Sequence, residues 1–169
     1  MLTGRTFKRV SGTLHCLVFL GLVVVGCGGE SADDLFTKGE HATHDVETYE
    51  EAIGHLSTFI DRFPDDPRAD VALQALARVY QAQGKSDVAI KTYTTLISRF
   101  PKSRYADQAE FMVGYIHDLA GDKAEALKAY QKVIDNYPES GLGDDARVSI
   151  LNIDKPLEDW IGPEGVSAQ

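Results

Sequence analysis

Apolar residues in the middle of this chain recur with the spacing of helices that bury one face. Between residues 67 and 103 two such groups follow one another: Leu73, Leu76, Ala77 and Tyr80, then Ala89, Tyr93, Leu96 and Ile97. Positions three and four apart share a helical face, so each group predicts an amphipathic helix. Gly84 lies between the groups, where a helix can end in a left-handed residue that glycine adopts without strain. The pattern therefore predicts a helical hairpin.

This hairpin is one copy of an internal repeat with a step of 37 residues, because an aromatic residue followed by proline recurs at 63/64, 100/101 and 137/138. The same shift pairs residues of one kind: Ala69 with Ala106, Ala72 with Ala109, Leu76 with Val113, Gly84 with Gly121, Ala89 with Ala126, Tyr93 with Tyr130 and Leu96 with Val133. Repeats of this length bury their apolar faces against neighbouring copies. We therefore expect an all-α solenoid of about three hairpins.

Short polar residues after each aromatic-proline pair predict where the next hairpin begins. Asp66, Ser103 and Ser140 stand one period apart, in position to cap the following helix. Two further pairs have the spacing of a capping box: Thr48 with Glu51, and Asp122 with Glu125. The expected units are residues 34–66, 67–103 and 104–140, followed by a capping helix at 141–153 and a tail at 154–169. In the first unit, "HATHDVET" predicts a longer joint between the two helices.

The spacing of one set of repeat residues resembles the tetratricopeptide repeat: Gly114, Gly121, Ala126, Tyr130 and Pro138. That resemblance implies a right-handed solenoid. The period is longer than the usual 34 residues, and the "FP-x-S-x-YA" segment is similar to the BamD outer-membrane lipoprotein family and to the cell-envelope coordinator YbgF. The resemblance covers residues 33–152, fewer repeats than BamD proteins carry.

Residues 1–26 have the form of a secretory signal peptide, with Arg5, Lys8 and Arg9 before an apolar stretch. The sequence "VVGC" resembles the bacterial lipobox, which implies cleavage before Cys27 and attachment of lipid to its thiol. The alternatives are an uncleaved membrane anchor or a plain secretory signal. On the lipoprotein interpretation residues 27–33 form a lipidated linker, and Gly28 favours the periplasmic face of the outer membrane.

The charge of the chain argues against nucleic-acid partners. The net charge is −9, and removal of residues 1–26 takes away three basic residues and no acidic ones, which leaves −12. Such a surface repels phosphate backbones. Of the two cysteines, Cys16 lies in the predicted signal, so no disulfide is expected in the mature chain.

Catalytic and metal-binding motifs are not evident in the sequence, and we expect neither an enzyme nor a cofactor. His41 and His44, next to Asp45, have a spacing that suits a metal, but a polar loop is the simpler interpretation. His117 takes the place of Tyr80 in the repeat, which predicts a half-buried packing residue.

What a stack of hairpins offers is a groove for other proteins. The tetratricopeptide pattern implies that the groove is lined by Gln74, Arg78 and Gln81 in one unit and by Phe111, Tyr115 and Asp118 in the next. Phe111 and Tyr115 either bind a partner or pack inside the stack. Trp160 is expected to fold back with Leu157 and Ile161 over the open end, or else to dock a partner.

The resulting expectation is a lipid-anchored scaffold for envelope proteins, possible partners being the components that assemble outer-membrane barrels. A YbgF-like coordinator of cell-wall synthesis and an accessory subunit of an enzyme complex are the alternatives.

Overall fold

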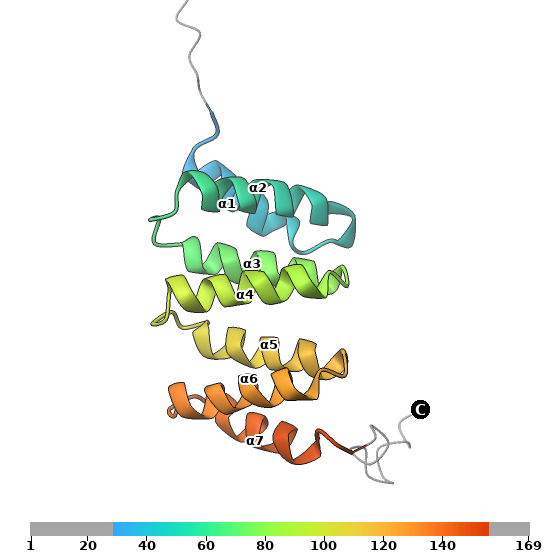
Figure 1. Cartoon of the computed structure of the whole chain (residues 1–169). Helices are drawn as coiled ribbons and strands as arrows, with labels where there is room; N and C mark the ends of the chain where they lie inside the picture. The colour runs from blue at the N-terminus through green and yellow to red at the C-terminus, as the bar shows by residue number, and fades with distance from the viewer. Residues whose placement is uncertain (1–28, 156–169) are drawn as a thin grey trace, which may run out of the picture.

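A computed structural model describes residues 29–155, and within this range every regular element is a helix (Figure 1). The elements in chain order are α1 (Ala32–Ala42), a 3-10 turn (Val46–Thr48), α2 (Tyr49–Arg62), α3 (Ala69–Ala82), α4 (Ser86–Arg99), α5 (Ala106–Leu119), α6 (Lys123–Asn136) and α7 (Leu142–Asn152). The predicted signal at 1–26, Cys27 and Trp160 lie outside the described residues. None of these helices is long and apolar enough to cross a bilayer.

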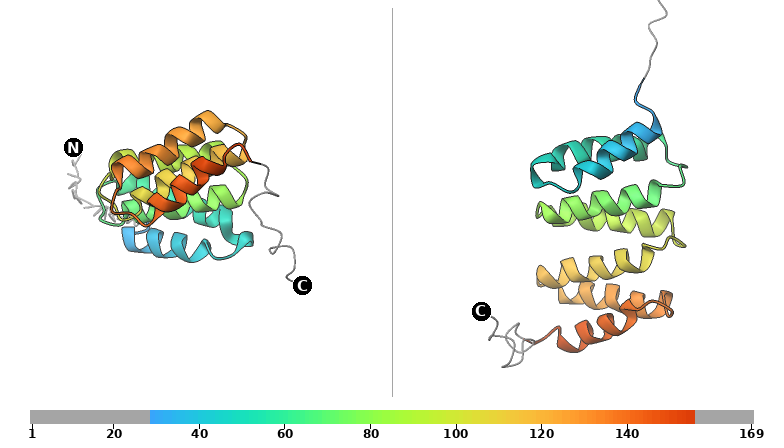
Figure 2. Two further views of the ribbon diagram at one scale, coloured as in Figure 1. Left: turned by 90° about the horizontal axis from the view of Figure 1, so that it is seen from below. Right: turned by 180° about the vertical axis from the view of Figure 1, so that it is seen from behind.

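Successive hairpins stack along one axis, with α1 and α2 at one end and α7 at the other (Figures 1 and 2). Each helix packs on its neighbours in the chain, and among the first helices α1 also contacts α3 and α5 contacts α7. A hydrogen bond between Gln74 and Gln108 joins α3 to α5. The predicted all-α solenoid of helical hairpins is therefore confirmed. The joints within hairpins lie on one side of the stack, and the turns between hairpins lie on the other (Figure 1).

Small residues at repeated positions allow the helices to approach closely. Ala52, Ala89 and Ala126, one period apart at the start of each second helix, are all fully buried. The largest buried rings, Tyr93 and Tyr130, also occupy one repeat position. Close packing of these positions excludes water from apolar surface, which stabilises each hairpin and its contact with the next.

The tight joints within the second and third hairpins depend on glycine. Gly84 and Gly121 have φ angles of +70° and +79°, the left-handed conformation that the sequence predicted. The residue after each glycine donates its amide to a carbonyl five residues earlier: Lys85 to Tyr80 at 2.9 Å and Asp122 to His117 at 2.8 Å. The first hairpin has no such glycine, and its joint at residues 43–48 is longer, as predicted, and contains the 3-10 turn.

The two predicted capping boxes are wrong. The side chains of Thr48 and Asp122 accept no hydrogen bond from the helices that follow them. Thr48 Oγ1 instead donates to the carbonyl of Ala42 at 2.8 Å, because the joint folds back on the end of α1. The capping box that does form joins Ser31 and Asp34 at the start of α1.

Asp66, Ser103 and Ser140 form their backbone hydrogen bonds slightly earlier in the chain than expected. Each accepts a hydrogen bond from the amide two residues later, at 2.9 to 3.1 Å, and so closes the turn before the helix instead of capping its first turn. The two serines also donate to a carboxylate of the preceding hairpin: Ser103 to Asp70 and Ser140 to Asp107, both at 2.6 Å. The turn residues therefore join consecutive hairpins.

The junction between the first and second hairpins has a different pair of side chains at the same repeat positions. Asp66 replaces serine there, so Asp33 of the preceding hairpin would face another carboxylate. Arg68 lies between the two acids, 2.7 Å from Asp33 and 2.8 Å from Asp66. Its guanidinium also lies over the rings of Phe36 and Phe59, at 4.9 and 5.5 Å from their centroids.

Candidate protein-binding groove

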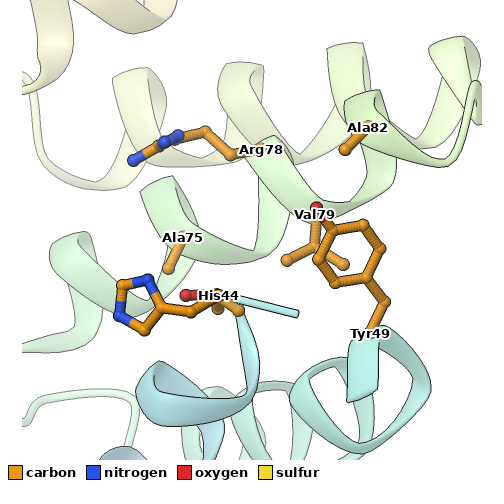
Figure 3. A pocket seen from close by; sticks show the side chains of 7 residues that line it. His44, Tyr49, Ala75, Arg78, Val79 and Ala82 are labelled. Atoms are coloured by element: carbon orange, nitrogen blue, oxygen red, sulfur yellow. The ribbon is translucent and has the colours of Figure 1, made fainter. Parts of the chain in front are cut away.

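Two adjoining pockets along α3 form the candidate groove. One pocket of about 370 Å³ lies between α3 and α5, lined by Arg78, Gln81, Ala82, Tyr93, Gln108 and Met112. A smaller pocket of about 140 Å³ lies between α3 and the joint of the first hairpin, lined by Thr43, His44, Tyr49, Ala75, Arg78, Val79 and Ala82. Figure 3 shows His44 and Tyr49 facing α3 across this smaller pocket, with Arg78 on its rim. Arg78 therefore borders both pockets.

Arg78 is the basic group of the groove. Its side chain is exposed, and within residues 29–155 it forms no ion pair. A guanidinium offers several donors in a fixed plane and binds carboxylates through two parallel hydrogen bonds. Arg78 is therefore available to a negatively charged group of a partner.

Amide side chains surround Arg78. Gln74 is only 6% exposed and donates through Nε2 to Gln108 Oε1 across the junction between α3 and α5, at 3.0 Å. The carbonyl oxygen of Gln74 is buried and has no hydrogen-bond partner in the described structure. Gln81 Oε1 accepts from the hydroxyl of Tyr93 at 3.2 Å. Burial raises the pKa of Tyr93 to about 12, although the charge of Arg78 acts in the opposite direction.

The next unit presents a less polar surface, and its two predicted aromatic residues differ. Phe111 is half-buried, and its ring packs on that of Tyr130 with centroids 5.3 Å apart. Tyr115 is 40% exposed. Packing therefore accounts for Phe111, whereas Tyr115 remains open to a partner. Asp118 is half-buried and lies 3.5 Å from the hydroxyl of Tyr130, a long contact.

Burial raises the pKa of Tyr130 to about 12, and the negative charge of Asp118 adds to this shift. Both buried tyrosines are therefore neutral at physiological pH. The hydroxyl of Tyr93 donates to Gln81, so α4 helps to position this groove residue.

Two exposed apolar residues on α5 and α7 were not predicted. Leu119 on α5 is 71% exposed and Val148 on α7 is 51% exposed. The repeat could have identified Leu119, because it lies one period after Ala82, which lines the larger pocket. Val148 lies one period after Phe111, a groove position only in the tetratricopeptide pattern. Gln108 was not predicted either; it lines the larger pocket and accepts a hydrogen bond from Gln74.

The structure also tests the interpretation of the histidines. His41 and His44 are both exposed near the joint of the first hairpin. No group of three His, Cys, Asp or Glu side chains in residues 29–155 is placed to hold a metal ion. His117 is half-buried, as predicted, with Nδ1 3.5 Å from a carboxylate oxygen of Asp122.

Comparison with known proteins gives a family for the central part of the chain. Residues 75–141 match the family model described as tetratricopeptide repeat. This segment runs from the middle of α3 to the turn before α7. No curated protein matches the chain. Tetratricopeptide repeats generally mediate interactions between proteins and are typically not catalytic. The match and the stacked hairpins together support a tetratricopeptide-repeat protein.

Proposed function

We propose that this protein is a lipid-anchored, non-enzymatic scaffold of the bacterial cell envelope that binds segments of other envelope proteins in the groove along α3, α5 and α7. The observation that carries the proposal is the composition of the groove. It combines a cation that forms no ion pair within residues 29–155, several amides and exposed apolar side chains, which are groups that recognise polypeptide. Its groups have no arrangement that suggests acid-base or nucleophilic chemistry.

The proposed anchor would hold a defined corner of the stack near the membrane. A side chain added at Gly29 would lie 3.1 Å from the guanidinium of Arg62, so residue 29 lies against the end of α2. Two further residues of extended chain reach about 7 Å at most. Lipid on Cys27 would therefore keep the turn between α2 and α3 close to the bilayer. Partners that are themselves embedded in the membrane would then be within reach of the groove.

Within this function, a role in the assembly of outer-membrane proteins is our first choice, supported by the similarity of the repeat to BamD lipoproteins. A YbgF-like role in cell-wall synthesis at the constriction site is the alternative. The two differ in the partner. A photo-reactive residue at position 115, followed by identification of the captured protein, distinguishes them. Recovery of cell-wall synthases alone would contradict the first role.

A pull-down from membranes with and without the Cys27→Ala change tests the anchor. Loss of the lipid should release the protein from membranes and reduce recovery of membrane-embedded partners. Binding to the same partners in detergent should persist, because the groove is unchanged. Unchanged membrane association of the Cys27→Ala protein would refute the lipoprotein assignment.

A further inference from the structure

The groove contains two different surfaces in neighbouring units. We define the amide subsite as Gln74, Arg78, Gln81 and Gln108, and the apolar subsite as Tyr115 and Leu119, which lie four residues apart on α5. Arg78 and Tyr115 occupy the same repeat position, 37 residues apart. The same place on the fold therefore offers a cation in one unit and an exposed ring in the next.

The amide subsite suits the backbone of an extended chain. A primary amide carries both donors and an acceptor, as a peptide group does. Among residues 29–155 the buried carbonyl oxygen of Gln74 has no hydrogen-bond partner, and a buried acceptor left without one costs about 1–3 kcal/mol. A bound peptide N–H can satisfy this oxygen once the amide turns toward the groove. Arg78 next to it favours a carboxylate, with which it can form a bidentate pair.

The distance between the subsites restricts the spacing of the ligand. Neighbouring helices pack about 8–10 Å apart, and the hydrogen bond from Gln74 to Gln108 shows that α3 and α5 adjoin here. In a β-strand, residues on one face repeat about every 7 Å, and residues three apart point to opposite faces. In a polyproline II helix, residues three apart share a face and lie about 9 Å apart. This conformation also has no internal hydrogen bonds, so its backbone groups remain available to the glutamines.

We propose that the groove binds an extended, polyproline II-like segment of a partner protein in which an acidic side chain at Arg78 stands three residues from a large apolar side chain at the apolar subsite. This inference rests on the proposed binding function of the groove and specifies the chemistry of its ligand.

Labelled peptides titrated with the protein test this spacing. The panel holds a polar nine-residue peptide with Asp and Phe one, three or five residues apart, in both orders, and matched peptides with Asn or Lys in place of Asp. We expect the Asp peptide with a spacing of three, in one of the two orders, to bind at least tenfold more tightly than the other spacings. Arg78→Glu should remove this preference and favour the Lys peptide instead. Lys91→Glu, which changes an exposed cation on α4, is the matched control and should have no effect.

Affinities that do not depend on spacing, or an Arg78→Glu variant that binds the Asp peptide as well as the parent does, would overturn the inference. If Tyr115→Ala still weakens binding in that case, the groove remains the binding surface and only the ligand assignment fails. Binding to none of the peptides also overturns the inference, and crosslinking at position 115 then decides separately whether the groove binds protein.

Discussion

The close approach of α5 and α6 at Gly114 leads to a quantitative prediction for a pair of glycine substitutions. A Cβ atom at Gly114 would lie 2.8 Å from Cδ1 and from Cε1 of Tyr130, nearer than atoms in contact can lie. Tyr130 is 1% exposed and cannot swing into solvent. Gly54 in the interior of α2 is the matched control, because a Cβ atom there would have no neighbour within 4 Å.

The expected magnitudes follow from two opposing terms. Alanine stabilises the interior of a helix by about 1 kcal/mol relative to glycine, and this gain applies at both positions. Forcing an extra carbon into a packed core costs about 1–3 kcal/mol, and this cost applies only at position 114. Gly54→Ala should therefore raise the free energy of unfolding by about 1 kcal/mol. Gly114→Ala should lie about 1–3 kcal/mol below the control.

Urea denaturation followed by circular dichroism measures both values, provided that the slopes of the transitions agree. A compensating change sharpens the test. In the preceding hairpin, Ala77 occupies the repeat position of Gly114 and packs in the core with Tyr93. Gln74 there takes the place of Phe111. Phe111→Gln should therefore recover part of the loss caused by Gly114→Ala. Equal stabilities of the Gly114→Ala and Gly54→Ala proteins would refute the packing argument.

Three further predictions concern the contacts between hairpins and the buried rings. Ser140→Ala removes the hydrogen bond to the carboxylate of Asp107, so α7 should be destabilised by about 1–2 kcal/mol and its amides should exchange faster with deuterium; unchanged exchange would contradict this role. With Arg68→Ala, the free energy of unfolding should fall less steeply as the pH is lowered. Arg68 lowers the pKa of Asp66, and the stability gained in this way is lost as the pH falls below the ordinary aspartate value of 3.8. Acid denaturation curves with the same slope in both proteins would count against this role. Burial raises the pKa values of Tyr93 and Tyr130 to about 12, so the free energy of unfolding should fall between pH 10 and 12. The expected fall is roughly 2 kcal/mol for each ring. Tyr130→Phe should remove about half of it in alkaline denaturation curves.

The repeat explains why much of the fold was predictable from sequence. Each helix has its own apolar face, and the left-handed glycines at 84 and 121 mark local chain reversals. Signals of this kind act over a few residues and can be recognised in isolation. The predictions of capping boxes at 48 and 122 were wrong because these hydrogen bonds depend on more than the local sequence. The hydroxyl of Thr48 is used by a carbonyl of the preceding helix, a contact that depends on how the longer joint folds.

The groove was harder to predict because exposure depends on neighbours from other units. Phe111 and Tyr115 are both aromatic residues on α5, yet only Phe111 lies against Tyr130. Leu119 and Val148 are ordinary core residue types, yet both are exposed in the stack. Similarly, no local pattern indicates that Ser140 reaches Asp107 in the preceding hairpin.

The central claim is that the groove along the first helices, and not the outer face of the second helices, binds other proteins. Photo-reactive residues placed one at a time at Tyr115 and at Lys91 in cells test it most directly, because both positions are exposed but lie on different helices of their hairpins. If the groove binds other proteins, position 115 should give a specific crosslink to an envelope protein and position 91 should give none. A crosslink from position 91 alone, or equal crosslinks from both positions, would contradict it.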